Sequence, residues 1–138
     1  MKTIEFLPHT ADLKMRLRAD SVIRLFEAGM EGMKQVMKKG ACKTNNNTTV
    51  KVKIHITSPD LTSLLVEFLG EVLTLSHNLK TIFCRLKVAS VNNQEIIGQI
   101  EGVKVVDFDE DIKAVTYHEA DVQVNDQGTY ETFIIFDI

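Results

Sequence analysis

The sequence contains no tryptophan and only two cysteines, Cys42 and Cys84, among its 138 residues. Two thiols can form at most one disulfide, so neither a disulfide-rich scaffold nor a cysteine-based zinc site is expected. No apolar stretch approaches the roughly 20 residues that a membrane-spanning helix needs. Glu5, Pro8 and Asp12 interrupt the N-terminal segment, which therefore contains no signal-peptide core. These absences predict a soluble, cytoplasmic protein that works in a reducing compartment without a membrane partner.

Familiar catalytic motifs are also missing. The chain holds neither a P-loop nor a GxGxxG, GxSxG or HExxH motif. One acidic cluster lacks the spacing and the central glycine of an EF-hand loop, so an exposed loop is the simpler interpretation. This cluster comprises Asp107, Asp109, Glu110 and Asp111. Because no nucleophile lies beside a partnered base, we expect a protein that is not itself an enzyme.

What is present is the composition of an ordinary globular protein. Hydrophobic residues make up 44% of the chain and charged residues 25%. The length fits one domain that covers residues 1–138. The net charge of −3 does not suggest a protein whose main work is to coat nucleic acid, although local basic patches are possible.

The hydrophobic periodicity predicts two helices and several strands. A helix is expected to begin at Ser21 and end at Gly40, because apolar residues recur at steps of three and four between them. A second helix is expected from residues 58–60 to residues 77–79. Alternating or apolar runs predict strands over residues 3–7, 13–19, 50–56, 82–90, 95–102, 112–118, 121–124 and 130–138.

The order of these elements predicts the fold class. We expect an α+β single-domain, two-layer sandwich in which two amphipathic helices pack on a mostly antiparallel sheet. A doubly wound parallel fold does not fit, because the second half of the chain has no crossover helices. The consecutive apolar residues of FIIF, 133–136, predict an inner strand that is covered on both faces.

Polar residues stand out in four places, and each has a purely structural explanation beside a functional one. In HTAD, residues 9–12, Asp12 could bind a ligand or simply satisfy backbone donors in a turn. In KAVTYH, residues 113–118, Lys113 could be an exposed lysine at a strand end. Asp60 fits a helix cap. Asp137 follows FIIF and could bind a ligand. The structural explanation is a frayed chain end, although so apolar a run should not fray.

Together, HTAD, SPDLTSLLVEFLGEVL, KAVTYH and the final FDI resemble the archease family over essentially the whole chain. Archeases are small α+β proteins that assist the RtcB-type RNA-splicing ligase. That ligase forms a covalent guanylate on an active-site histidine and joins tRNA halves during tRNA splicing and RNA repair. The resemblance implies an accessory protein that promotes guanylylation and repeated turnover of the ligase. Indirect contact with tRNA or GTP through the ligase is compatible with this role.

The resemblance also implies a divalent-metal site. Its motif positions fall on Asp12, Asp137 and Ile138, and Lys113 is the other position tied to activity. Calcium and magnesium both prefer oxygen ligands such as these carboxylates and a backbone or terminal oxygen of Ile138. With few protein ligands, several coordination positions would stay open. His9 and His118 could orient the acids by hydrogen bonds, although a structural role is the simpler one for each.

The sequence departs from the family pattern at several positions. Lys14 stands where a small residue is usual, Glu119 stands where Asp or Asn usually follows KAVTYH, and no tryptophan precedes the last strand. Two other functions stay open besides the accessory role. One is a general chaperone or protein-interaction module with a structural metal, and the other is a metal-dependent phosphoesterase. A basic strand face, formed by Lys14 and the two arginines that follow it at every second position, could meet RNA or an acidic patch of the ligase. An ordinary solvated face is the simpler interpretation.

Overall fold

The computed structural model describes residues 1–7, 12–43 and 48–138. The chain forms two helices and eight strands in these parts. Their order is β1 (Lys2–Leu7), β2 (Asp12–Ala19), α1 (Val22–Met37), β3 (Val50–Thr57), α2 (Leu61–Leu79), β4 (Thr81–Val91), β5 (Glu95–Lys104), β6 (Ala114–Thr116), β7 (Gln123–Val124) and β8 (Tyr130–Asp137). No described helix is both long and apolar enough to cross a membrane.

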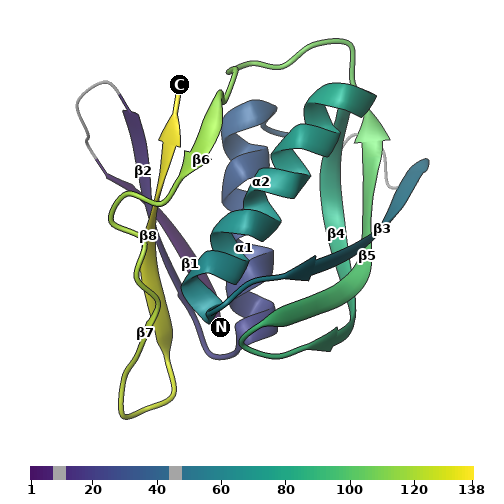
Figure 1. Ribbon diagram of the computed structural model, residues 1–138. Coiled ribbons are helices and arrows are strands. Elements are labelled where there is room, and N and C mark those ends of the chain that lie inside the picture. The colour runs from purple at the N-terminus through teal and green to yellow at the C-terminus, as the bar shows by residue number, and fades with distance from the viewer. Residues whose placement is uncertain (8–11, 44–47) are drawn as a thin grey trace.

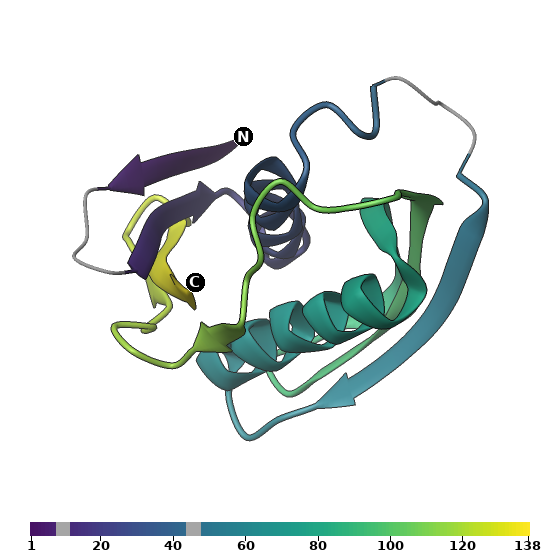
Figure 2. The ribbon, with the colours of Figure 1, turned by 90° about the horizontal axis from the view of Figure 1, so that it is seen from above.

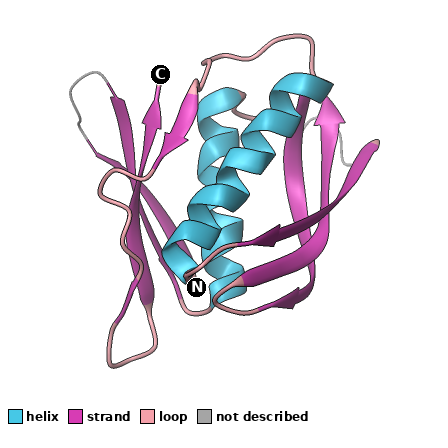
Figure 3. Ribbon diagram, viewed as in Figure 1, coloured by secondary structure: helices cyan, strands magenta, loops and turns pink. Residues whose placement is uncertain are grey.

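The strands divide between two antiparallel sheets. The five-stranded sheet has the order β1-β2-β8-β6, with β7 also paired to β8, and the three-stranded sheet has the order β3-β5-β4. Both helices lie between the two sheets (Figures 1 and 2). The predicted α+β class is therefore confirmed, with two helices packed on antiparallel sheets. The expected single sheet is instead two sheets, so the helices have a sheet on each side (Figure 3).

The division follows from strand pairings that are distant in sequence. β4 and β5 form a hairpin. β3, which precedes them in sequence, pairs along the other edge of β5, from Val50 opposite Gly102 to Thr57 opposite Glu95. In the same way, β8 inserts between β2 and β6. Periodicity within each strand gives its buried face but not its partner, and this is why the sequence predicted the strands without their grouping.

Both helices begin at the caps that the sequence indicated. The Ser21 side chain accepts a hydrogen bond from the Arg24 amide at 3.1 Å, and the Asp60 side chain accepts one from the Ser63 amide at 2.8 Å. The structural explanation of Asp60 as a helix cap is therefore confirmed. The first helix ends at Met37, three residues before Gly40, which adopts a positive φ of 85°.

The last strand, β8, is an inner strand as expected. It pairs with β2 on one side and with β6 on the other, and Ile134, Ile135 and Phe136 are all buried. Phe133 is only half-buried, because its ring faces the cationic side chains of β2: the Lys14 ammonium lies 4.5 Å from the ring centroid and the Arg16 guanidinium 5.8 Å.

Two strands are shorter than the sequence suggested. The strand expected over 112–118 covers only Ala114–Thr116, and the one expected over 121–124 covers only Gln123–Val124. A turn separates them, in which the Ala120 amide donates to the Tyr117 carbonyl and Glu119 has a φ of 60°. The left-handed conformation of Glu119 ends the extended backbone. The polar sequence around Glu119 gives no sign of this turn.

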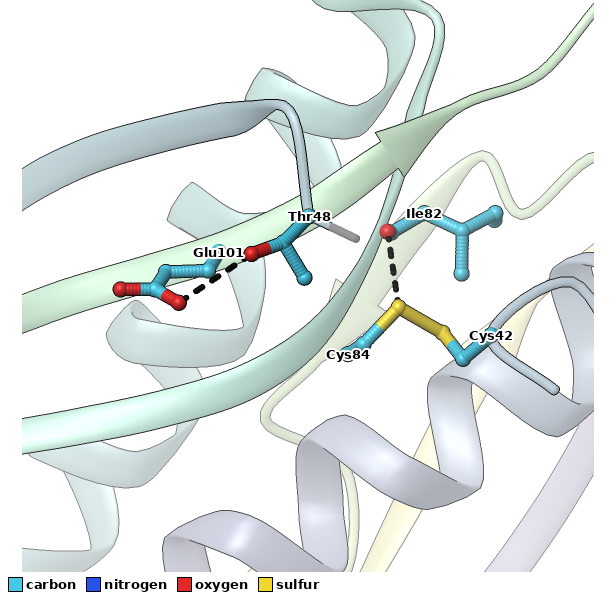
Figure 4. Close-up of a disulfide and its surroundings, with 5 residues drawn as sticks. All are labelled: Cys42, Thr48, Ile82, Cys84 and Glu101. Atoms are coloured by element: carbon cyan, nitrogen blue, oxygen red, sulfur yellow. Dashed lines mark hydrogen bonds between the residues drawn. A yellow bond between two sulfur atoms is a disulfide. The ribbon is translucent and has the colours of Figure 1, made fainter. Parts of the chain in front are cut away.

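The two cysteines form a disulfide. Cys42, in the segment after α1, is bonded to Cys84 in β4, with Cα atoms 5.9 Å apart (Figure 4). Cys84 Sγ also lies 3.5 Å from the Ile82 carbonyl oxygen. The single disulfide that the cysteine count allowed is thus present, although the reducing compartment that the sequence predicted does not favour one. The bond links the segment after α1 to β4 of the three-stranded sheet.

Candidate metal site

The two predicted metal-binding aspartates lie directly opposite each other in the five-stranded sheet. Asp12 opens β2 and pairs in register with Asp137, which closes β8. Side chains of directly opposed residues in an antiparallel pair have Cβ atoms about 4.5–5.5 Å apart. Residues that are 125 positions apart in sequence therefore come together at one edge of the sheet.

Strand alternation assigns these two carboxylates to the outer face of the sheet. In β2 the residues Met15 and Leu17 are buried against the helices, whereas Lys14 and Arg16 lie on the opposite face. Asp12 is two residues before Lys14 and so shares its face. Asp137 is exposed and Asp12 is half-buried, so solvent reaches the pair.

Lys113 directly precedes β6, the third strand at this edge. Ala114, in β6, pairs with Asp137, and the Lys113 amide donates a hydrogen bond of 2.7 Å to the main-chain oxygen of Asp137. The end of β8 is therefore fixed from both sides, by β2 and by the segment that leads into β6. Asp137 therefore lies between two other predicted site residues, Asp12 on one side and Lys113 on the other. The Lys113 side chain is exposed.

Ile138 anchors this edge from the interior. Its side chain is half-buried and packs against the hydrophobic core. The main-chain oxygen of Asp137 already accepts the Lys113 amide, so the backbone oxygen of Ile138 is the more available main-chain ligand. The FIIF run thus holds Asp137 and Ile138 in place by burial rather than leaving them to fray.

The donor set fits a hard divalent cation with an open coordination sphere. Two carboxylates and one main-chain oxygen supply only oxygen ligands, which calcium and magnesium prefer. In the described ranges, no three His, Cys, Asp or Glu side chains gather closely enough to hold a metal ion. The set of Asp12, Asp137 and Ile138 includes only two such side chains, so most coordination positions would be filled by other molecules.

The two predicted histidines have different outcomes. His9 lies outside the described residues. His118 follows β6 and is exposed, and its amide donates to Thr116 Oγ1 at 3.3 Å. That threonine hydroxyl in turn donates to the Ile135 carbonyl at 3.0 Å, which ties the segment to β8. A role for either histidine in orienting the acids stays a prediction.

The structure adds one residue near the site that the sequence did not single out for a role. Glu119 forms an ion pair of 2.8 Å with Lys14, on the same face of the sheet as Asp12. The other cations of this basic strand face are also paired. Arg16 lies 3.7 Å from both Glu5 and Glu131, and Arg18 lies 2.9 Å from Glu131. These pairs favour the interpretation of an ordinary solvated face.

Comparison with known proteins identifies the family of this chain. The model of the archease protein family (MTH1598/TM1083) matches residues 4–138. The chain belongs to the archease family. It is 31% identical to the archease of Methanosarcina mazei over 145 residues, with 99% of this chain and 97% of the relative covered. It is 29% identical to the archease of Sulfolobus acidocaldarius over 143 residues, with both chains fully covered.

Two solved structures share the fold. The solution structure of Methanobacterium thermoautotrophicum protein 1598 has a TM-score of 0.78 at 23% identity, and 98% of each chain is covered. The crystal structure of a Thermotoga maritima archease, described as a possible chaperone, has a TM-score of 0.63 at 16% identity and covers 96% of this chain. The resemblance drawn from HTAD, KAVTYH and FDI is therefore confirmed for family and fold.

Proposed function

We propose that this protein is an accessory factor of an RtcB-type RNA ligase. It promotes guanylylation of the ligase and its repeated turnover in tRNA splicing and RNA repair. The observation that carries the proposal is the register of Asp12 opposite Asp137, with the Lys113 amide bonded to Asp137. Membership in the archease family supports the same role.

The site's own residues suggest how it contributes. Asp12 and Asp137 present two carboxylates on a solvent-facing edge, and Ile138 fixes that edge by packing into the core. When bound there, calcium or magnesium would supply a positive charge able to bind phosphate or carboxylate oxygens. Lys113 adds an exposed ammonium, which can attract a phosphate group as a point charge.

The open edge explains why such a protein would act through a partner. A pair of carboxylates leaves most of a cation's coordination positions unfilled, and groups of the ligase or its nucleotide could complete them. In this proposal the protein positions a charge and the ligase performs the covalent chemistry. Contact with GTP or tRNA is indirect, and the protein works in the cytoplasm with the ligase.

A second candidate is a general chaperone with a structural metal. The observation in its favour is that the Thermotoga maritima protein of the same fold is described as a possible chaperone. A chaperone should suppress the aggregation of unrelated clients, whereas a ligase factor should act only on its ligase.

One set of assays separates these functions. The purified protein is assayed alone for phosphoester hydrolysis, with an aggregating unrelated client, and with the cognate ligase plus GTP and cleaved RNA. We expect the protein to stimulate guanylylation of the ligase, and to give no effect in the other two assays. Hydrolysis by the isolated protein would instead support a phosphoesterase, and protection of the unrelated client would support the chaperone.

A further inference from the structure

No helix or strand of the described residues covers the outer face of the three-stranded sheet. Ile54, Leu86 and Ile100 are buried on the face toward the helices. The alternate residues of the same strands, such as Lys53 and Lys87, are exposed on the opposite face. Figures 1 and 2 show both helices on one side of this sheet only.

Cations line both edges of this outer face. Opposite Glu101 of the central strand β5 lie Lys51 of β3 and Arg85 of β4. Opposite Gln99 lie Lys53 of β3 and Lys87 of β4. The face therefore carries two successive rungs, each with a cation on either side of a residue of β5.

Glu101 forms an ion pair with one cation of each rung, Arg85 of the first and Lys87 of the second. It is only 1% exposed, and its carboxylate lies 3.4 Å from Arg85 Nη1 and 3.1 Å from Lys87 Nζ. It also accepts hydrogen bonds from Gln99 Nε2 at 2.7 Å and from Thr48 Oγ1 at 3.3 Å (Figure 4 shows the Thr48 bond). The ion pair with Lys87 is the main reason that the pKa of Glu101 is lowered. The carboxylate thus stays charged and holds two cations in fixed positions.

The second rung has no acid at its centre. Gln99 is neutral, and no described carboxylate lies within ion-pair distance of Lys53. Four cations against the single carboxylate of Glu101 leave the two rungs with a net charge of +3, in a chain whose net charge is −3. Elsewhere on the outer face of these strands, the imidazole Nε2 of His55 lies 2.7 Å from the Glu95 carboxylate.

A hollow lies between the cations of the second rung. Its volume is about 510 Å³, and its lining includes Lys53 on one side and Lys87 on the other. The rest of the lining is mostly apolar and comes from the central strand β5 and the edge strand β4. It consists of Val88, Ala89, Ile97 and Gly98, together with the amide side chain of Gln99.

We propose that this outer face of β3, β5 and β4 binds the phosphodiester backbone of single-stranded RNA, with the phosphates seated between Lys53 and Lys87. Side chains two residues apart on a strand are spaced by about 6.6 Å, and the two edge strands are about 9.6 Å apart. Such paired rows form a positively charged groove that can follow a flexible phosphate chain. No aromatic side chain of β3, β4 or β5 alternates onto the two rungs, so base stacking is not expected and recognition would not depend on sequence.

This inference goes beyond the proposed function, in which RNA is met only through the ligase, and its test needs no ligase. Binding of a labelled 20-nucleotide single-stranded RNA is followed by fluorescence anisotropy at several salt concentrations. The test variant is Lys53→Gln combined with Lys87→Gln. The matched control is Arg24→Gln combined with Lys39→Gln, which removes the same charge from exposed residues outside the three strands.

The test variant is expected to bind RNA about tenfold more weakly than wild type near 0.1 M salt. The slope of the logarithm of its binding constant against the logarithm of the salt concentration should be shallower by about 1.4, because two phosphate contacts are lost. The control variant should keep both values within about twofold of wild type. Lys53→Arg with Lys87→Arg should restore binding, since phosphate binding needs the charge. Circular dichroism checks that each variant is folded.

Three results would overturn the proposal. One is equal RNA binding by the test variant and wild type, and another is equal weakening in test and control variants. The third is binding of poly-glutamate in place of RNA, which would assign the face to an acidic protein surface. The ligase assays are independent, so loss of RNA binding here leaves the accessory role standing, and the converse also holds.

Discussion

Replacing Asp137 with asparagine should stabilise the metal-free protein slightly and remove the stabilisation that a divalent cation gives. Asp137 lies directly opposite Asp12, and like charges in that position destabilise a sheet by roughly 0.2–1 kcal/mol. Unfolding a chain of 138 residues changes the entropy by roughly 0.29 kcal/mol/K. A gain of about 0.5 kcal/mol therefore raises Tm by about 2 °C.

The cation should have the larger effect on wild type. A ligand at 100 times its Kd that binds only the folded state adds about 2.7 kcal/mol, which corresponds to about 9 °C in Tm for this chain. Asp137→Asn removes one of the two carboxylates, so most of that gain should disappear. The strand pairing of β8 with β2 and the hydrogen bond from the Lys113 amide involve only the main chain of Asp137, so both survive the substitution.

Thermal unfolding followed by circular dichroism, with chelator and with calcium or magnesium, measures both effects. The matched control is Asp126→Asn, an exposed acid in the turn before β8, which should respond to the cation as wild type does. The reasoning is refuted if Asp137→Asn gains as much Tm from the cation as wild type, or if wild type gains nothing at millimolar concentrations.

Three further perturbations follow from the fold. Replacing both Cys42 and Cys84 with serine should lower the free energy of unfolding by roughly 3–4 kcal/mol in urea, because the bridge closes a loop between residues 42 positions apart; unchanged stability would contradict this. Gly98→Ala places Cβ 2.4 Å from the Lys87 carbonyl oxygen and should cost at least about 2 kcal/mol by the same measurement. Glu119→Asn relieves a φ of 60° but removes the ion pair with Lys14, so we expect little change at low salt and a gain of about 0.5 kcal/mol in 1 M salt; a loss at both salt concentrations would contradict it.

Local patterns predicted most of the elements, because each depends on a few neighbouring residues. The alternation of Lys14 and Arg16 with Met15 and Leu17 gave β2 its two faces, and the Ser21 and Asp60 side chains cap the helices. The apolar FIIF run correctly indicated an inner strand.

The grouping of strands into two sheets could not be predicted in this way. It depends on β3 pairing with β5 and on β8 inserting between β2 and β6, and neither pairing leaves a trace within a single strand. The left-handed Glu119 that shortens β6 was also hidden, since glutamate rarely adopts that conformation.

The sequence motifs predicted residues of the metal site, and the fold brings two of them together. Nothing in HTAD or FDI alone says that Asp12 and Asp137 are opposed, and the register of β2 with β8 supplies that fact. The cationic rungs around Glu101 were missed because β3 and β4 are separated in sequence by a helix. The alternating lysines of β3 indicated a basic strand face. Only the pairing of β3 and β4 with β5 shows which residues lie beside those lysines.

The accessory role is tested most directly by repeated RNA joining with the cognate ligase. Wild type, Asp137→Asn, Lys113→Ala and the control Asp126→Asn are compared, with no residues added after Ile138. The account predicts that wild type and the control stimulate guanylylation and multiple turnover, and that the other two variants, still folded, lose at least tenfold of the stimulation. Equal stimulation by Asp137→Asn and wild type would contradict the carboxylate site.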